Sequence, residues 1–136
     1  MIPYNNIISH TVPSAAPLSL SVISGSPDSL NLQWLPPPED GQNGIIISYS
    51  VNVTHNSTGD VQHFSGIKEQ YFTVEFLSPY TAYLCSVAAH TTIGMGPYAV
   101  PELAITDEDG MIVVYIIYTI VDSFSIIILY TNTSCH

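Results

Sequence analysis

Few residues of this sequence have the types and the spacing that catalysis needs. Ser65-Gly-Ile-Lys68 matches a Ser-x-x-Lys nucleophile pattern, but the partner motifs of that pattern are absent and no helix is predicted to display it. No Gly-x-Ser-x-Gly sequence occurs. Cys85 falls on the inward face of an alternating run, where burial keeps a thiol protonated and unreactive. The sequence therefore predicts no catalytic residue and no enzyme.

Metal ligands are also too sparse to predict a metal site. His55 and His63 would approach each other across a predicted hairpin, but a zinc site uses about three protein ligands or more. Glu39-Asp40 and Asp107-Glu-Asp109 could hold calcium weakly, although calcium prefers about six oxygens or more from a shaped cage. A solvated loop and a linker explain these two acidic clusters equally well. We expect no metal and no cofactor.

Three Asn-x-Ser/Thr triplets could accept a glycan: Asn52-Val-Thr54, Asn56-Ser-Thr58 and Asn132-Thr-Ser134. Asn52 falls on the outward face of a predicted strand, and Asn56 falls in the turn that follows it. Asn132 lies just after an apolar segment and is the poorer acceptor. Asn52 and Asn56 are therefore the candidate N-glycosylation sites, provided that the chain enters the secretory route.

The charge balance restricts the class of partner. The chain has one basic residue, Lys68, no arginine, and eleven carboxylates, for a formal net charge of −10. Such a surface lacks the positive footprint that binds phosphate backbones or anionic lipid heads. Nucleic acid is therefore excluded as a partner.

The elements that position these residues are predicted strands. Residues 72–89 contain two alternating apolar runs, separated by a corner at Ser78-Pro-Tyr-Thr81. Pro79 cannot donate a hydrogen bond to a sheet, so the first run must end there. In the second run alternate residues share one face, as in a half-buried strand: Tyr83, Cys85, Val87 and Ala89.

Five further strands are indicated by alternating runs between clusters of turn residues. They are predicted at residues 18–22, 30–34, 45–53, 61–65 and 99–106. In the 45–53 run we expect four residues to point inward: Ile47, Tyr49, Val51 and Val53. Seven strands with turn signals at short intervals predict an all-β sandwich of two antiparallel sheets.

Several landmarks in order resemble the fibronectin type III family: Pro17, Trp34, Tyr49, Leu77-x-Pro79-x-Thr81-x-Tyr83 and Gly94-x-Gly96. The resemblance covers about residues 12–109 and implies a seven-stranded antiparallel immunoglobulin-like sandwich. It also implies a tyrosine corner, in which the hydroxyl of Tyr83 bonds back to the chain just upstream. The expected structural core residues are Trp34, Tyr49, Leu77, Pro79 and Tyr83.

An apolar segment from Met111 to Tyr130 departs from that family pattern. Its length of about 20 residues matches the hydrocarbon core of a bilayer. Apolar residues favour insertion by roughly 0.3–0.6 kcal/mol each, and Asp122 opposes it by about 2.5–3.5 kcal/mol, so the balance favours insertion by a small margin. A β-prone extension and a mis-spliced reading frame are the competing interpretations. We expect a hydrophobic tail over 110–136 with a candidate transmembrane segment at 111–130.

The resemblance implies a non-catalytic, extracellular protein-interaction or adhesion module of a cell-surface receptor-like protein. The alternative is a structural spacer from an incomplete chain, with no ligand of its own. Residues 1–11 are interpreted as a linker or the start of a fragment, with no signal peptide visible. The expected location is the cell membrane or the outside of the cell, with a single pass if 111–130 is a true span. Exposed aromatic residues are the candidate contacts: Tyr71, Phe76, Tyr80 and Tyr98.

Overall fold

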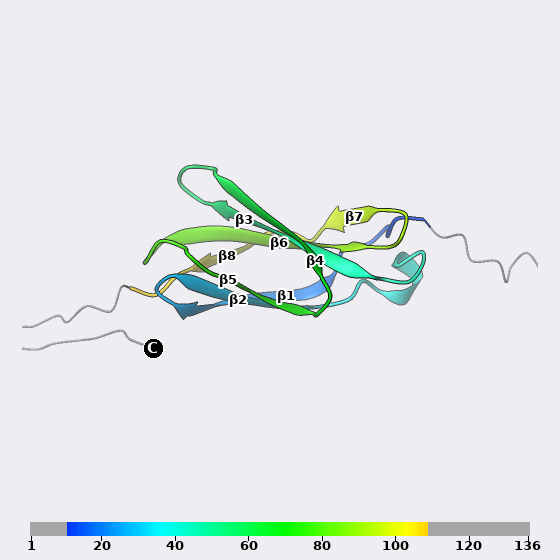
Figure 1. The fold of residues 1–136 in the computed structure, drawn as a ribbon, viewed down its shortest axis with the longest axis horizontal. Helices are drawn as coiled ribbons and strands as arrows, with labels where there is room; N and C mark the ends of the chain where they lie inside the picture. Colours follow the sequence, from blue (N-terminus) through cyan, green and yellow to red (C-terminus); the bar gives the residue numbers. More distant parts are fainter. Residues whose placement is uncertain (1–10, 109–136) are drawn as a thin grey trace, which may run out of the picture.

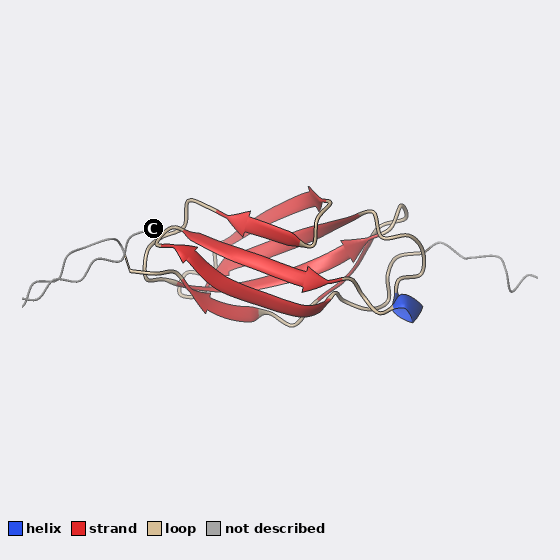
Figure 2. Cartoon of the chain, turned by 90° about the horizontal axis from the view of Figure 1, so that it is seen from below, coloured by secondary structure: helices blue, strands red, loops and turns tan. Residues whose placement is uncertain are grey.

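The computed structural model describes residues 11–108, which form two packed antiparallel sheets (Figure 1). The first sheet has the strand order β1-β2-β5 and the second β4-β3-β6-β7, with β8 also pairing with β6. Viewed from below, the strands run along the long axis of the molecule (Figure 2). The strands are β1 (Leu18–Ser26), β2 (Ser29–Leu35), β3 (Ser48–His55), β4 (Val61–Ile67), β5 (Tyr71–Val74), β6 (Ala82–His90), β7 (Met95–Tyr98) and β8 (Glu102–Ile105).

The described residues contain no α-helix, and a single turn of 3-10 helix, η2 (Glu39–Gly41), lies between β2 and β3. Every strand pair is antiparallel. The two-sheet, all-β sandwich predicted from the alternating runs is therefore confirmed. Figure 1 places the first and the last described residues at opposite ends of the long axis.

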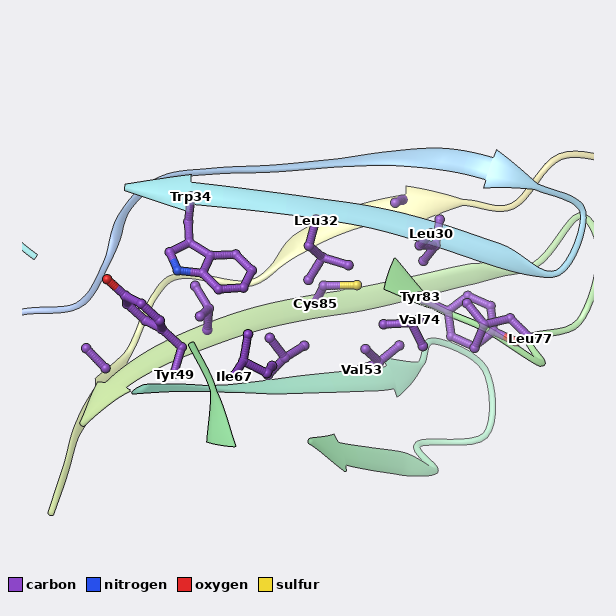
Figure 3. Packing of buried hydrophobic residues seen from close by; sticks show 14 residues of the cluster. Leu30, Leu32, Trp34, Tyr49, Val53, Ile67, Val74, Leu77, Tyr83 and Cys85 are labelled. Atoms are coloured by element: carbon purple, nitrogen blue, oxygen red, sulfur yellow. The ribbon is translucent and has the colours of Figure 1, made fainter. Parts of the chain in front are cut away.

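The core fills the space between the two sheets (Figure 3). Leu30, Leu32 and Trp34 alternate on β2 and face Tyr49, Val51 and Val53 of β3 and the inward residues of β6. The rings of Trp34 and Tyr49 meet edge to face, with centroids 5.3 Å apart. The indole is 3% exposed, and its Nε1 makes no hydrogen bond within the described residues.

The third strand begins later than the sequence predicts, at Ser48 rather than at Ile45. Ile45 is 72% exposed and Ile47, expected to point inward, is 40% exposed. The Ile47 amide bonds to the His90 carbonyl at 2.8 Å, so the chain already lies beside β6 before the regular ladder starts. The predicted strand is too long because the residues just before Ser48 are also apolar. These residues lie at one end of the sandwich, where Ile45 and Ile47 are exposed.

The final predicted strand, 99–106, forms only in part, as β8 (Glu102–Ile105), and a further strand, β7 (Met95–Tyr98), lies just before the predicted range. Residues 99–101 separate the two strands: the Ala99 amide still donates to the Val87 carbonyl at 2.8 Å, whereas Pro101 has no N–H to donate. The described sandwich therefore has eight strands rather than seven, and β7 and β8 pair with different parts of β6.

No helix in residues 11–108 is long and apolar enough to cross a membrane. The candidate transmembrane segment from Met111 to Tyr130, the acceptor Asn132 and residues 1–10 of the predicted 1–11 linker lie outside the described residues.

Candidate interaction surfaces

A tyrosine corner fixes the connection between β5 and β6. The hydroxyl of Tyr83, at the start of β6, accepts a hydrogen bond of 2.9 Å from the Ser78 amide. Leu77 is buried, and its amide bonds to the Asp28 carbonyl in the β1–β2 turn at 2.9 Å. Pro79, expected in the core, is instead exposed, because it sits at the outer bend of the corner, where its carbonyl accepts the Thr81 hydroxyl at 2.7 Å.

Two aromatic residues project from this corner into solvent. Phe76 is 91% exposed and Tyr80 is 71% exposed. Both have a left-handed backbone, with φ of 63° at Phe76 and 46° at Tyr80. That conformation is uncommon for any residue with a side chain and a genuine outlier for a bulky one. The Tyr80 amide is held by the Asp107 carbonyl at 2.9 Å, so the corner also contacts the end of the described chain.

A polar cluster lies on the outer face of the second sheet. Asn52 of β3 stands between His63 of β4 and Ser86 of β6 in the strand register. The ring Nδ1 of His63 lies 2.7 Å from the Asn52 Oδ1, and the Tyr98 hydroxyl of β7 lies 3.4 Å from the same ring nitrogen. We call these three residues, Asn52, His63 and Tyr98, the outer-face cluster.

A second polar pair lies next to this cluster. The Ser50 hydroxyl and the His90 Nε2 are 2.6 Å apart, and Ser50 is fully buried although it lies on the outer face. Burial lowers the pKa of His90, and the positive charge that His63 can carry lowers it further. Burial raises the pKa of the Tyr98 phenol, partly offset by its hydrogen bond from Asn52.

The thiol in the described core is unreactive. Cys85 is fully buried on β6, and burial raises the pKa of its thiol to about 12. At neutral pH the thiol is therefore protonated and a poor nucleophile, as the sequence predicts. The hollows of the described surface are shallow, and one of about 290 Å³ lies on the outer face of the first sheet, beside Ile23 and Tyr71.

The remaining candidate residues are dispersed. His55 does not meet His63: its ring packs edge-on against Tyr83, with centroids 5.3 Å apart, and its Nδ1 accepts the amides of Ser57 and Thr58. Lys68 donates to the Ile47 carbonyl at 3.3 Å. Within residues 11–108, three or more His, Cys, Asp or Glu side chains nowhere gather as metal ligands would.

Sequence reasoning missed the outer-face cluster, although it placed Asn52 outward. The missing element is β7, since Tyr98 reaches the cluster from that strand and the sequence predicts no strand at residues 95–98. The Asn52–His63 pair lies between the β3–β4 turn and a bulge in β4, where Gly66 has a φ of 73°. The alternation of apolar and polar residues predicts the face of the sheet on which a residue lies, but not which residues lie beside it on the adjacent strands.

Comparison with known proteins identifies the family. A model of the fibronectin type III domain matches residues 15–103. The chain belongs to the fibronectin type III family. It is 35% identical over 103 residues to receptor-type tyrosine-protein phosphatase F of Mus musculus, covering 73% of this chain and 5% of that protein. It is 31% identical over 109 residues to protein sidekick-2 of Mus musculus, covering 78% of this chain and again 5% of the relative.

Solved structures of fibronectin type III and related domains share this fold. The FN5 domain of Drosophila Lar superimposes with a TM-score of 0.58 at 24% identity, over 71% of this chain and 98% of that one. A crystal structure of titin domains gives a TM-score of 0.63 at 30% identity, over 71% of this chain and 33% of that one. The chain thus spans about a twentieth of the receptor phosphatase and sidekick proteins, and corresponds to a single module of them.

Proposed function

We propose that this fibronectin type III module is a non-catalytic protein-interaction or adhesion module of a cell-surface receptor-like protein. Its relatives include a receptor-type phosphatase and sidekick proteins, which supports a setting at the cell surface. The matched segment is the module itself, and the proposal assigns it no catalytic role. The partner is another protein, and the contact is made by exposed aromatic residues.

The aromatic pair Phe76 and Tyr80 carries this proposal. A bulky residue in the left-handed region raises the free energy of the folded state by roughly 1–2 kcal/mol. Glycine or asparagine would relieve that strain at either position. The two rings are largely exposed, so they contribute little to the core. Large aromatic side chains are enriched in protein interfaces. Binding to a partner would therefore explain why the two rings are exposed, whereas the stability of the fold does not explain it.

A structural spacer without a ligand is the second candidate. It is favoured by the placement of the two described ends at opposite poles of the sandwich (Figure 1). A module of that shape separates its neighbours in a longer chain. A spacer, however, has no use for two exposed aromatic rings on strained backbone.

A bead-binding assay separates the two candidates. Beads coated with the full chain are mixed with one another and with a panel of cells, and clustering and cell binding are counted. The double variant Phe76→Ser/Tyr80→Ser should abolish binding, whereas Tyr71→Ser, at a 64% exposed position on β5, should preserve it. Absence of binding by the wild-type chain, or binding that survives the double substitution, would contradict the interaction proposal and leave the spacer.

A further inference from the structure

The two glycan acceptor triplets of the domain occupy different surroundings. Asn52 lies in the middle of β3, which pairs with β4 on one side and with β6 on the other. Asn56 lies one residue beyond β3, in the exposed turn that leads to β4. Both triplets satisfy the same sequence rule, so only their structural positions distinguish them.

The side-chain amide of Asn52 is hydrogen-bonded to His63 and lies beside Tyr98. Its Oδ1 accepts from His63 Nδ1 at 2.7 Å, and the Tyr98 hydroxyl, whose pKa burial raises and the Asn52 side chain lowers, lies 3.4 Å from the same nitrogen. Its cross-strand neighbour Ser86 is buried, so the surface around the amide is closed on that side. A sugar on Nδ2 would have to displace the Tyr98 ring and leave the polar groups of the cluster without partners.

The side chain of Asn56 has no comparable contacts within the described residues. It is exposed and makes no hydrogen bond within the described residues, while its backbone amide is held by the Ala82 carbonyl at 2.9 Å. Gly59, with a φ of 82°, closes the turn by donating to the His55 carbonyl at 2.8 Å. The turn therefore has a fixed backbone that presents a free amide to solvent.

We infer that Asn56 is the N-glycosylation site of this domain and that the outer-face cluster keeps Asn52 unmodified. The inference rests on the proposed location outside the cell, because the donor is a lipid-linked oligosaccharyl pyrophosphate of the secretory route. The Asn56 Nδ2 forms a bond to the anomeric carbon of the oligosaccharide. The bond from that carbon to the pyrophosphate oxygen breaks, the lipid pyrophosphate leaves with the electron pair, and the amide proton passes to a base of the transferase.

Folding explains why the two sites differ even though the transferase meets an extended chain. A glycan at Asn56 remains in the solvent when β3 and β4 pair. A glycan at Asn52 would oppose closure of Tyr98 and His63 over β3, so a chain modified there is depleted from the folded, secreted protein. The Thr58 hydroxyl, which the transferase reads, makes only local bonds to Asp60 in the same turn, at 3.0 Å and 3.2 Å.

The test uses the full chain with an added secretion leader, so that its outcome does not depend on the natural location. Asn132→Gln is present throughout, which leaves only the two domain sites. Glycopeptides of the secreted protein are quantified by mass spectrometry, together with the gel shift on glycosidase treatment. Asn56→Gln should remove the shift. Thr54→Ala, which destroys the first triplet without altering the Asn52 side chain, should leave the shift unchanged.

A third variant tests the protective role of the cluster. In a chain carrying Asn56→Gln, the further substitutions His63→Ala and Tyr98→Ala should make Asn52 newly modified. Asn52 occupied as fully as Asn56 in the wild-type chain, or a secreted wild-type chain with no glycan, would overturn the inference. An Asn52 that stays bare after both cluster residues are replaced would overturn the protective role. Failure of the bead-binding assay would leave these results unaffected.

Discussion

At the scale of single residues, one hydroxyl holds the β5–β6 corner. The Tyr83 oxygen accepts the Ser78 amide at 2.9 Å, and this amide is partly buried. Removing the acceptor leaves the amide without that bond, and a donor left unpaired away from water raises the free energy of the folded state. Removal of the hydroxyl alone leaves the aromatic ring of Tyr83 packed against the core.

Tyr83→Phe should therefore reduce the free energy of unfolding by roughly 1–2 kcal/mol. Denaturant titration followed by Trp34 fluorescence measures the change. Tyr80→Phe is the matched control, since Tyr80 is largely exposed in the same corner, and its effect should stay within about 0.5 kcal/mol. Equal effects of the two substitutions would remove the special role of the Tyr83 hydroxyl.

The strained backbone of Phe76 gives an opposite prediction. Phe76→Gly relieves a left-handed strain of roughly 1–2 kcal/mol and loses about 0.5–1 kcal/mol through the greater freedom of the unfolded chain. We expect a net stabilisation of up to about 1.5 kcal/mol in the same titration. Glu75→Gly, at an exposed neighbour without positive φ, should destabilise by roughly 0.5–1 kcal/mol. A destabilised Phe76→Gly protein would mean that the ring serves the fold rather than a partner.

At the scale of elements, the outer face of the second sheet couples folding to pH. Burial and His63 hold the pKa of His90 below its ordinary value of 6.5. Between the lowered pKa and 6.5, the unfolded chain binds more protons than the folded one. Acid therefore shifts the equilibrium toward the unfolded chain over this window, and below the lowered pKa the effect adds nothing more.

The free energy of unfolding should thus fall between pH 7.5 and pH 5, and His90→Gln should flatten that dependence. The comparison uses denaturant titrations of both proteins at several pH values across this range. Gln can still bond to Ser50 without acquiring a charge, so the substitution separates the titration from the packing. Parallel pH profiles for the two proteins would rule out His90 as a source of the dependence.

The strands and the family were predictable, because alternation and turn residues recur along the whole domain. Tyr83, Trp34 and Cys85 lie where period two places them. What could not be predicted depends on register and on the ends of elements. Tyr98 reaches the outer-face cluster from β7, where the sequence predicts no strand, and β8 covers only part of the predicted last strand. Pro79 is exposed because it lies at the outer bend of the β5–β6 corner. The sequence motif predicts the corner but does not specify which of its residues face solvent.

At the scale of the whole molecule, the sandwich has one core to which both sheets contribute, and its reporters should change together. Trp34 and Cys85 lie on opposite sheets of that core (Figure 3). In a Cys135→Ser protein, we expect thiol labelling of Cys85 to appear at the same denaturant concentration as the change in Trp34 fluorescence, since small domains unfold cooperatively. Labelling well before the fluorescence change would show that β6 opens separately.

The opposite placement of the described ends has a mechanical consequence. Tension applied through the chain would run along the strands, so that β8 is pulled lengthwise against β6 and their hydrogen bonds are loaded in shear, all at once rather than one after another. A bond from the Asp107 amide to the Ser24 hydroxyl, at 2.9 Å, fastens the exit of the chain to β1 at that pole. If the load broke this end, residues 11–108 would lengthen to about 330 Å at full extension. The domain should therefore resist stretching along its long axis more strongly than a sheet whose hydrogen bonds are loaded one at a time.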